Sequence, residues 1–258
     1  MMPTTCSSAA APKSLPRTDH PKPMPEIRLT PVTDTAPAAW LHTSLMDWER
    51  VAKDFPAYAR ILHPVTEIRT GDPVPWASVT RAFGPAHPDR MDVIIELAES
   101  DVWDQPEQGS LEQPHLNALL DILARHTTTP EHCYLGTWEG WQWYNPSKRR
   151  SGPVRALNPQ DIPQEIRDQA SFELPADRRY VLLRGPIRDA AHIGGHVTPR
   201  TLIMRSPNLL WPADHTWFVY TEIDDYETYI SGSEQLIDEL AASPLLEVEK
   251  IGTDHPDA

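Results

Sequence analysis

Residues 206–251 read SPNLLWPADHTWFVYTEIDDYETYISGSEQLIDELAASPLLEVEKI, and strand, turn and helix signals follow one another there with almost no filler. Aromatic and β-branched residues dominate 215–224, a composition that predicts a strand. Only a short connection separates this run from the next apolar run at 228–230, which favours an antiparallel hairpin. Ser231 and Glu234 then match the S-x-x-E capping box, so we expect a helix to begin there.

A second regular pattern marks a helix in the middle of the chain. Between 114 and 126, leucines recur at positions i, i+3, i+4 and i+7, which gives this helix one apolar face that must pack on something. Together these signals predict an α+β protein, with a mixed, mostly antiparallel sheet packed against a few helices. The predicted strands lie near residues 58–65, 132–143, 179–183, 216–223 and 228–230, and the covering helices near 114–126 and 234–242.

The first 38 residues differ in composition from the rest of the chain. Residues 1–38 are rich in Pro, Ala, Ser and Thr, so they lack the apolar area that would offset the entropy lost on folding. We therefore expect a disordered N-terminal tail, followed by a single globular α+β domain over 39–258. A helix is expected near 39–55, and the polar, proline-punctuated loop at 146–175 is the candidate sub-boundary within the domain.

The formal net charge of −14 at pH 7 argues against two classes of partner. Nucleic acids and anionic membranes would both be repelled at long range, so we expect neither among the partners. The basic run at 148–150 precedes a Ser-Gly-Pro turn and is typical of a solvated loop. The sequence has no apolar run of about 18 residues and no signal-peptide layout, which favours a cytoplasmic location.

Familiar catalytic motifs are missing from the sequence. It contains no P-loop, no dinucleotide-binding glycine pattern, no H-E-x-x-H, no paired C-x-x-C and no G-x-S-x-G. His192 and His196 are four residues apart, but the two glycines between them favour a loop over a metal-binding helix face. The acidic strand end at 222–225 likewise favours a solvated turn over a divalent-cation site. We therefore expect neither a cofactor nor a metal.

The two cysteines point to a reduced protein without a disulfide framework. Cys6 lies in the predicted tail and Cys133 in a predicted strand, far apart in the sequence. His126 and His132 lie near Cys133 and would be candidate bases for a thiol nucleophile. A lone cysteine in an aromatic strand is nevertheless more often a small buried hydrophobe, so we expect a structural role.

Tryptophans are concentrated in two segments of the chain, the first at 138–144 and the second at 211–217, and we expect these segments to be neighbours in the sheet. If a strand runs through the first segment, alternation places Trp141 and Trp143 on the same face. Acidic residues nearby would complete a pocket for a cation, a sugar or a peptide, whereas the alternative is that the aromatic side chains fill the core. The candidate binding residues are Trp141, Trp143, Trp211, Glu139, Glu222 and Asp224, and the other aromatic members are Trp138, Tyr144 and Trp217.

Two blocks resemble a group of uncharacterised proteins from actinobacteria. The first is CYLGTWEGWQW at 133–143, and the second runs from Ser206 to Leu246 and includes the glycine-serine helix start. The resemblance extends from about Trp40 to the end of the chain. It implies that the ordered part is one recurrent unit and that a bacterial cytoplasm is its location, and it carries no activity, cofactor or substrate.

Three functions are compatible with these features. Aromatic density without a catalytic motif favours a non-catalytic binding or protein-interaction module that uses a Trp-rich surface and binds a protein or a small molecule. The first alternative is a hydrolase-like enzyme with a dispersed site, in which Glu139, Glu222 or His215 acts as acid or base. The second is a toxin-neutralising partner protein, which would fit the acidity of a small α+β unit.

Overall fold

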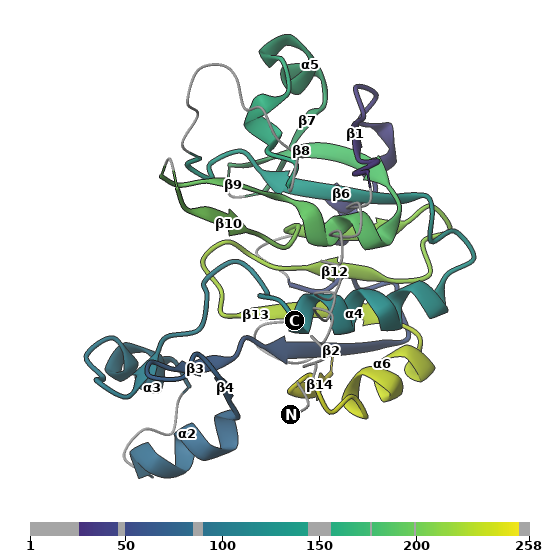
Figure 1. Ribbon diagram of the computed structural model, residues 1–258. Helices are drawn as coiled ribbons and strands as arrows, with labels where there is room; N and C mark the ends of the chain where they lie inside the picture. Colours follow the sequence, from purple (N-terminus) through teal and green to yellow (C-terminus); the bar gives the residue numbers. More distant parts are fainter. Residues whose placement is uncertain are drawn as a thin grey trace, which may run out of the picture.

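One large antiparallel sheet organises the protein, as Figure 1 shows for the computed structural model. The structure describes residues 26–45, 50–84, 90–143, 156–175, 177–198 and 200–252. Within them, nine strands form this sheet in the order β1-β8-β6-β11-β12-β13-β2-β14, with β7 also paired to β8. The strands are β1 (Thr30–Pro31), β2 (Ala57–Leu62), β6 (Cys133–Trp138), β7 (Ser171–Leu174), β8 (Arg178–Gly185), β11 (Leu209–Pro212), β12 (Phe218–Tyr220), β13 (Glu227–Gly232) and β14 (Val248–Ile251). The predicted α+β class is confirmed, and every pairing in this sheet is antiparallel.

Helices and two small sheets complete the described structure. The helices are η1 (Ala36–Ala38), α1 (Leu41–Ser44), α2 (Trp76–Phe83), α3 (Arg90–Leu97), α4 (His115–Leu123), η3 (Ala124–His126), η4 (Pro159–Asp161), α5 (Gln164–Gln169), η5 (Ile187–His192) and α6 (Glu234–Ala241). One small sheet pairs β9 (Gly194–His196) with β10 (Leu202–Met204), and the other pairs β3 (Val65–Glu67) with β4 (Pro73–Val74) and β5 (Trp103–Asp104). Of the helices in the described ranges, none combines the length and the apolar character needed to cross a membrane.

In the stretch 206–251 the predicted hairpin and helix form, whereas β11 was not predicted and the helix cap differs. β12 and β13 form the expected hairpin, and α6 and β14 follow. The N-cap of α6 is Ser233, whose Oγ accepts a hydrogen bond from the Leu236 amide at 3.2 Å. The predicted cap, Ser231, is wrong because that residue is still paired with Tyr58 of β2, and its Oγ accepts a hydrogen bond from the Ala52 amide instead.

Helices α4 and α6 cover one face of the sheet (Figure 1). The regularly spaced leucines of α4, among them Leu119 and Leu123, are buried with Leu236 and Leu240 of α6 in one apolar cluster. Trp217 lies in the same cluster, and its Nε1 donates a hydrogen bond to the Leu123 carbonyl at 3.1 Å. The helix that the leucine spacing predicts therefore packs on the sheet as expected.

The opposite face of the sheet is aromatic and is covered by the N-terminal segment. Tyr180, Trp211 and Phe218 are buried there against Leu41 and Leu45. The segment also adds β1, which pairs with β8, so the fold begins before the predicted boundary at residue 38. The composition of residues 26–38 concealed this because a two-residue strand needs no apolar run of its own. Residues 1–25 lie outside the described ranges.

Two other segments differ from the sequence-based expectation. The described part of the loop predicted at 146–175 contains α5 and also β7, which extends the pairing of β8. Since β6 before this segment and β8 after it are direct neighbours, the segment connects two adjacent strands of one sheet. The helix predicted near 39–55 is described only as η1 followed by the short α1, and residues 46–49 of that span are not described.

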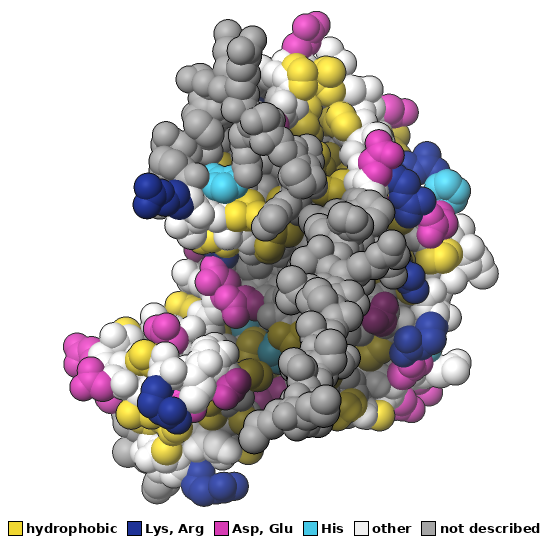
Figure 2. Space-filling model, viewed as in Figure 1, with side chains coloured by type: hydrophobic (Ala, Val, Ile, Leu, Met, Phe, Trp, Pro, Cys, Tyr) yellow, Lys and Arg dark blue, Asp and Glu magenta, His cyan; other side chains and the backbone are white. Residues whose placement is uncertain are grey.

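The short strands β3, β4 and β5 form a small lobe with α2 and α3, at the lower left of Figure 1. Its own apolar cluster contains Trp76, Val79 and Leu97. Arg90 of α3 ties the lobe to the main sheet, because its guanidinium pairs with Glu227 of β13 and, at 2.7 Å, with Glu249 of β14. Figure 2 shows acidic side chains on the surface of this lobe, in keeping with the acidic net charge.

A buried histidine lies where β2 leaves the main sheet for this lobe. His63 is 0 % exposed, and its Nδ1 lies 2.7 Å from the Glu107 carbonyl while its Nε2 lies 2.9 Å from Thr228 Oγ1. Because a carbonyl oxygen only accepts, Nδ1 carries the proton and Nε2 accepts a hydrogen bond from Thr228. Burial, together with the neighbouring His115, lowers the pKa of His63 to about 3.

We expect this histidine to make the protein sensitive to mild acid. Below about pH 6.5 the unfolded chain takes up a proton at His63 that the folded protein does not bind until about pH 3. The free energy of unfolding therefore keeps its full value above this pH window. Within the window it falls by about 1.4 kcal/mol per pH unit for one proton. Urea unfolding at a series of pH values measures this slope.

The control for this slope uses two variants. His63→Gln keeps a donor and an acceptor but has no proton to take up, so it should lower the slope between pH 6.5 and pH 4.5 by about 1.4 kcal/mol per pH unit. His42→Gln, at an exposed position on α1, should leave it unchanged. An unchanged slope in His63→Gln would contradict the assignment of the acid sensitivity to His63.

Candidate functional site

The two most buried tryptophans lie on opposite faces of the sheet. Trp211 and Trp217 are both 0 % exposed, one in the aromatic cluster under the N-terminal segment and the other under α4. Trp143 is also buried, at 9 % exposure, and Trp141 is half-buried. The prediction of an exposed surface that includes Trp211 and Trp143 is therefore wrong, and the alternative that large aromatic side chains fill the core holds for both of them.

The first tryptophan segment does lie beside the second one, as expected. β6 pairs with β11, with Trp211 opposite Tyr134. β6 ends at Trp138, however, so no strand runs through Trp141 and Trp143 and their predicted alternation does not apply. Tyr144 lies outside the described residues.

Asn208 fixes the end of β6 and the half-buried Trp141. It is 0 % exposed, and its Oδ1 accepts hydrogen bonds from the Trp138 amide at 3.0 Å and from Trp141 Nε1 at 3.3 Å. Its Nδ2 donates to the Thr221 carbonyl at 3.0 Å. The Arg205 guanidinium lies 4.3 Å from the centre of the Trp141 ring, so an arginine of this chain already occupies one face of that indole.

The acidic candidates fall into separate environments. Glu222 is buried at 2 % exposure and accepts a hydrogen bond from Arg178 Nε at 3.0 Å, while Asp224 is exposed and pairs with the same guanidinium at 2.5 Å. Glu139 accepts from Ser171 Oγ at 2.6 Å and pairs with Arg179 at 3.1 Å. The three carboxylates are therefore engaged in ion pairs of the fold.

Within the described residues, the histidine and cysteine candidates serve the fold and form neither a metal site nor an activated thiol. His196 lies in β9, and its Nδ1 lies 3.3 Å from the Thr198 carbonyl, so Gly194 and Gly195 belong to a hairpin strand rather than a helix. Burial raises the pKa of Cys133 to about 12, which leaves it a protonated, unreactive thiol at neutral pH. The described part of the chain contains no group of three or more His, Cys, Asp or Glu side chains placed to hold a metal ion.

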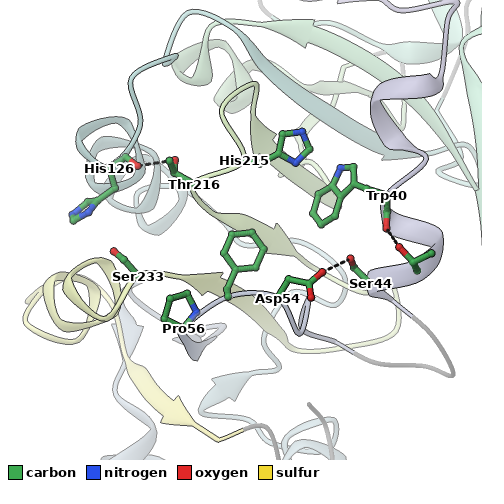
Figure 3. Close-up of a pocket in the computed structure, with 10 residues that line it drawn as sticks. Trp40, Ser44, Asp54, Pro56, His126, His215, Thr216 and Ser233 are labelled. Carbon is green, nitrogen blue, oxygen red and sulfur yellow. Dashed lines mark hydrogen bonds between the residues drawn. The ribbon is translucent and has the colours of Figure 1, made fainter.

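A cavity of about 570 Å³ opens at one end of the main sheet (Figure 3). Five segments converge on it: α1 with the residue before it, the approach to β2, the end of η3, the β11–β12 turn, and the residue that caps α6. The described residues that line it are Trp40, Thr43, Ser44, Asp54, Phe55, Pro56, His126, His215, Thr216 and Ser233. Aromatic and hydroxyl side chains thus share its wall.

Trp40 is the aromatic wall of this cavity and rests on the core. Its ring makes edge-on contacts with Trp211 at 6.1 Å, Phe218 at 5.3 Å and His215 at 5.1 Å between ring centres. Such contacts hold an aromatic ring in one orientation. The sequence indicated Trp40 only as the start of an apolar helix face, and nothing local to it signals a cavity.

A hydrogen-bonded carboxylate fixes the turn that carries His215. Asp214 accepts hydrogen bonds from Thr127, Thr128 and Thr216 at 2.7 to 3.0 Å. Partial burial opposes ionisation, but these bonds, those of Thr128 first among them, lower the pKa of Asp214 to about 2. His215 adopts a positive φ of 54°, a conformation that a histidine holds only when its surroundings fix it.

Among the described residues that line the cavity, Asp54 is the one carboxylate. Asp54 lies on the same side as Trp40, with its Oδ2 at 3.5 Å from Ser44 Oγ (Figure 3). Partial burial lowers the pKa of His215, against the opposing effect of Asp214, so the ring is neutral at pH 7. The ring of His126 turns away from the cavity, and its Nε2 lies 2.6 Å from Glu239. Neither Lys nor Arg occurs among the described lining residues.

A second, smaller cavity of about 110 Å³ lies beside β6 and β8. Trp138, Glu139 and Trp143 line part of it, together with Arg179. Its volume is below the range of about 300–1,000 Å³ that ligand sites commonly occupy. It is therefore the weaker candidate, although it contains more of the residues that the sequence indicated.

Fold and cavity together define an α+β protein with a ligand-sized cavity at the end of an antiparallel sheet. Comparisons of the chain with protein families, with curated proteins and with solved structures found no match.

Proposed function

We propose that the protein is a non-catalytic binding module that holds a small molecule in the cavity beside Trp40. The observation that carries the proposal is a cavity of about 570 Å³ whose aromatic wall is braced by the core. This volume lies within the range of about 300–1,000 Å³ typical of small-molecule sites. Apolar surface from Trp40, Phe55 and Pro56 would supply most of the contact, and hydroxyl groups such as Thr216 would orient the ligand.

A binding role fits this geometry better than the hydrolase-like alternative does. Acid and base residues must lie within hydrogen-bond reach of one bound substrate. His215 lines the large cavity, Glu139 lines the small one, and Glu222 is buried against Arg178. The acidic net charge supports, as part of the same proposal, partners that are not nucleic acids.

Replacing Trp40 tests this proposal directly. A library of small fragments is screened by ligand-observed NMR, and we expect hits that compete with one another for a single site. The Trp40→Ala variant should bind these hits about tenfold more weakly, because loss of an aromatic wall removes roughly 1.4 kcal/mol of contact. Trp40→Phe, which keeps an aromatic ring, should retain most of the affinity.

The matched control is Trp141→Phe, which alters a half-buried tryptophan outside the cavity. It should leave fragment binding unchanged. Circular dichroism and thermal unfolding of each variant separate loss of the site from loss of the fold. Fragments that bind folded Trp40→Ala as well as they bind the unaltered protein would overturn the proposal.

A further inference from the structure

We infer that the ligand of the cavity beside Trp40 is a small organic cation, held by the Asp54 carboxylate and the aromatic wall. This inference rests on the proposed function and adds the chemical class of the ligand. It is motivated by the combination of a carboxylate, aromatic rings and hydroxyl groups in a cavity whose described lining has neither Lys nor Arg. Three independent features support it.

The first feature is the carboxylate on the cavity wall. Asp54 is exposed, and Ser44 Oγ, at 3.5 Å, is its hydrogen-bond partner among the lining residues. A carboxylate with this little neutralising contact attracts an organic cation by its charge, and it can also accept a hydrogen bond from an ammonium group that carries an N–H. The neighbouring Lys53 is exposed and is not one of the residues that line the cavity.

The second feature is the position of the aromatic rings relative to this carboxylate. Trp40 and Asp54 lie on the same side of the cavity, across from Ser233 and His126 (Figure 3). Phe55 follows Asp54 in the chain and also lines the cavity. The faces of tryptophan and phenylalanine rings attract a cation that lies within about 6 Å of the ring centre, and tryptophan does so most strongly.

The third feature is the negative charge just behind the wall. Asp214 is ionised throughout the physiological pH range and lies next to His215 in the chain, whereas Glu239 on the opposite side is neutralised by Arg125 and adds no net charge. The surrounding potential therefore attracts cations and repels anions, in the same direction as the net charge of −14. A phosphate or carboxylate ligand would find no described Lys or Arg in the lining to bind it.

A series of probes with the same shape but different charge tests this inference. Choline carries a positive trimethylammonium head, and neohexyl alcohol is its neutral carbon analogue. The anion of tert-butylacetic acid has the same neutral tert-butyl head as the alcohol, with a carboxylate at its other end. Titrations follow the indole N–H resonance of Trp40, which is assigned by its disappearance in Trp40→Phe. We expect choline to bind about tenfold more tightly than neohexyl alcohol, and the anion to bind most weakly.

The Asp54→Asn variant separates charge from shape. It should bring the affinity for choline close to that for neohexyl alcohol, and leave the affinity for the alcohol unchanged. Asp92→Asn, which removes an exposed carboxylate on α3, is the matched control and should preserve the tenfold preference. A preference for choline that survives Asp54→Asn would overturn the assigned role of this carboxylate.

The possible failures can be told apart. If neohexyl alcohol binds as tightly as choline, the ligand class is wrong while the binding cavity stands. Tighter binding of the anion would likewise overturn the cation assignment alone. If neither these probes nor the fragment library shifts the Trp40 resonance, the proposed function itself fails.

Discussion

Replacing Trp211 by alanine is expected to lower the free energy of unfolding by about 3–5 kcal/mol, the range for truncating a large aromatic side chain in a core. Trp211 is 0 % exposed and stacks on Tyr134 at 5.6 Å between ring centres, with Trp40 and Phe218 at 6.1 Å and 6.4 Å. Alanine leaves a void that these rings cannot fill. Urea unfolding followed by circular dichroism measures the loss.

The control is Trp141→Ala in the neighbouring tryptophan segment. Trp141 is half-buried and contributes a hydrogen bond to Asn208, a cation–π contact with Arg205 and an edge-on contact with Trp138, so its loss should be only about 1–2 kcal/mol. A Trp211→Ala variant as stable as the unaltered protein would contradict the placement of this side chain in the core. Such a result would instead support the hypothesis that Trp211 belongs to a binding surface.

Breaking the buried ion pair between Arg178 and Glu222 is expected to have an effect of similar size. Arg178 lies 3.0 Å from a carboxylate whose side chain is 3 % exposed. In Arg178→Met this carboxylate stays buried without its cation, which destabilises proteins by about 3–5 kcal/mol. Chemical denaturation of the variant measures this loss.

Two further variants make the ion-pair prediction specific. Adding Glu222→Gln to Arg178→Met removes the unpaired charge, so we expect the double variant to recover more than half of the lost stability. Arg179→Met, one residue further along β8, breaks a more exposed pair with Glu139 and should lose only about 0–1 kcal/mol. Equal losses at 178 and 179 would show that burial of Glu222 does not set the effect.

The sheet could be predicted from local patterns because its strands carry their own signals. β12 and β13 combine aromatic and β-branched residues with a short connection, and the leucines of α4 identify its buried face. β1 and β7 were missed because they have only two and four residues and lie in polar, proline-containing segments. β1 forms only on the edge of β8, which lies far along the chain, and β7 forms only as a hairpin with β8, which follows it closely.

The candidate site was much harder to predict than the fold. Composition identifies tryptophans, but it does not predict which face of the sheet each side chain occupies when both faces are covered. Trp211 and Trp217 have similar sequence surroundings, yet they are buried on opposite faces of the sheet. The cavity beside Trp40 needs five segments to converge, and none of them signals a cavity in the sequence. Asp54 and His215 are more than 150 positions apart, so only the sheet order brings them together.

β1 and β7 cover the same edge of β8, and this limits association between copies of the chain. An uncovered strand at the edge of a sheet offers a row of amide and carbonyl groups to which another molecule can add a strand. β7 pairs with the first half of β8 and β1 with its last residues, so two short segments with Pro31 and Pro175 at their ends cover that row. At the opposite edge, β14 is only four residues long and carries Lys250. Both borders of the sheet thus resist the intermolecular strand pairing that begins fibrous aggregation.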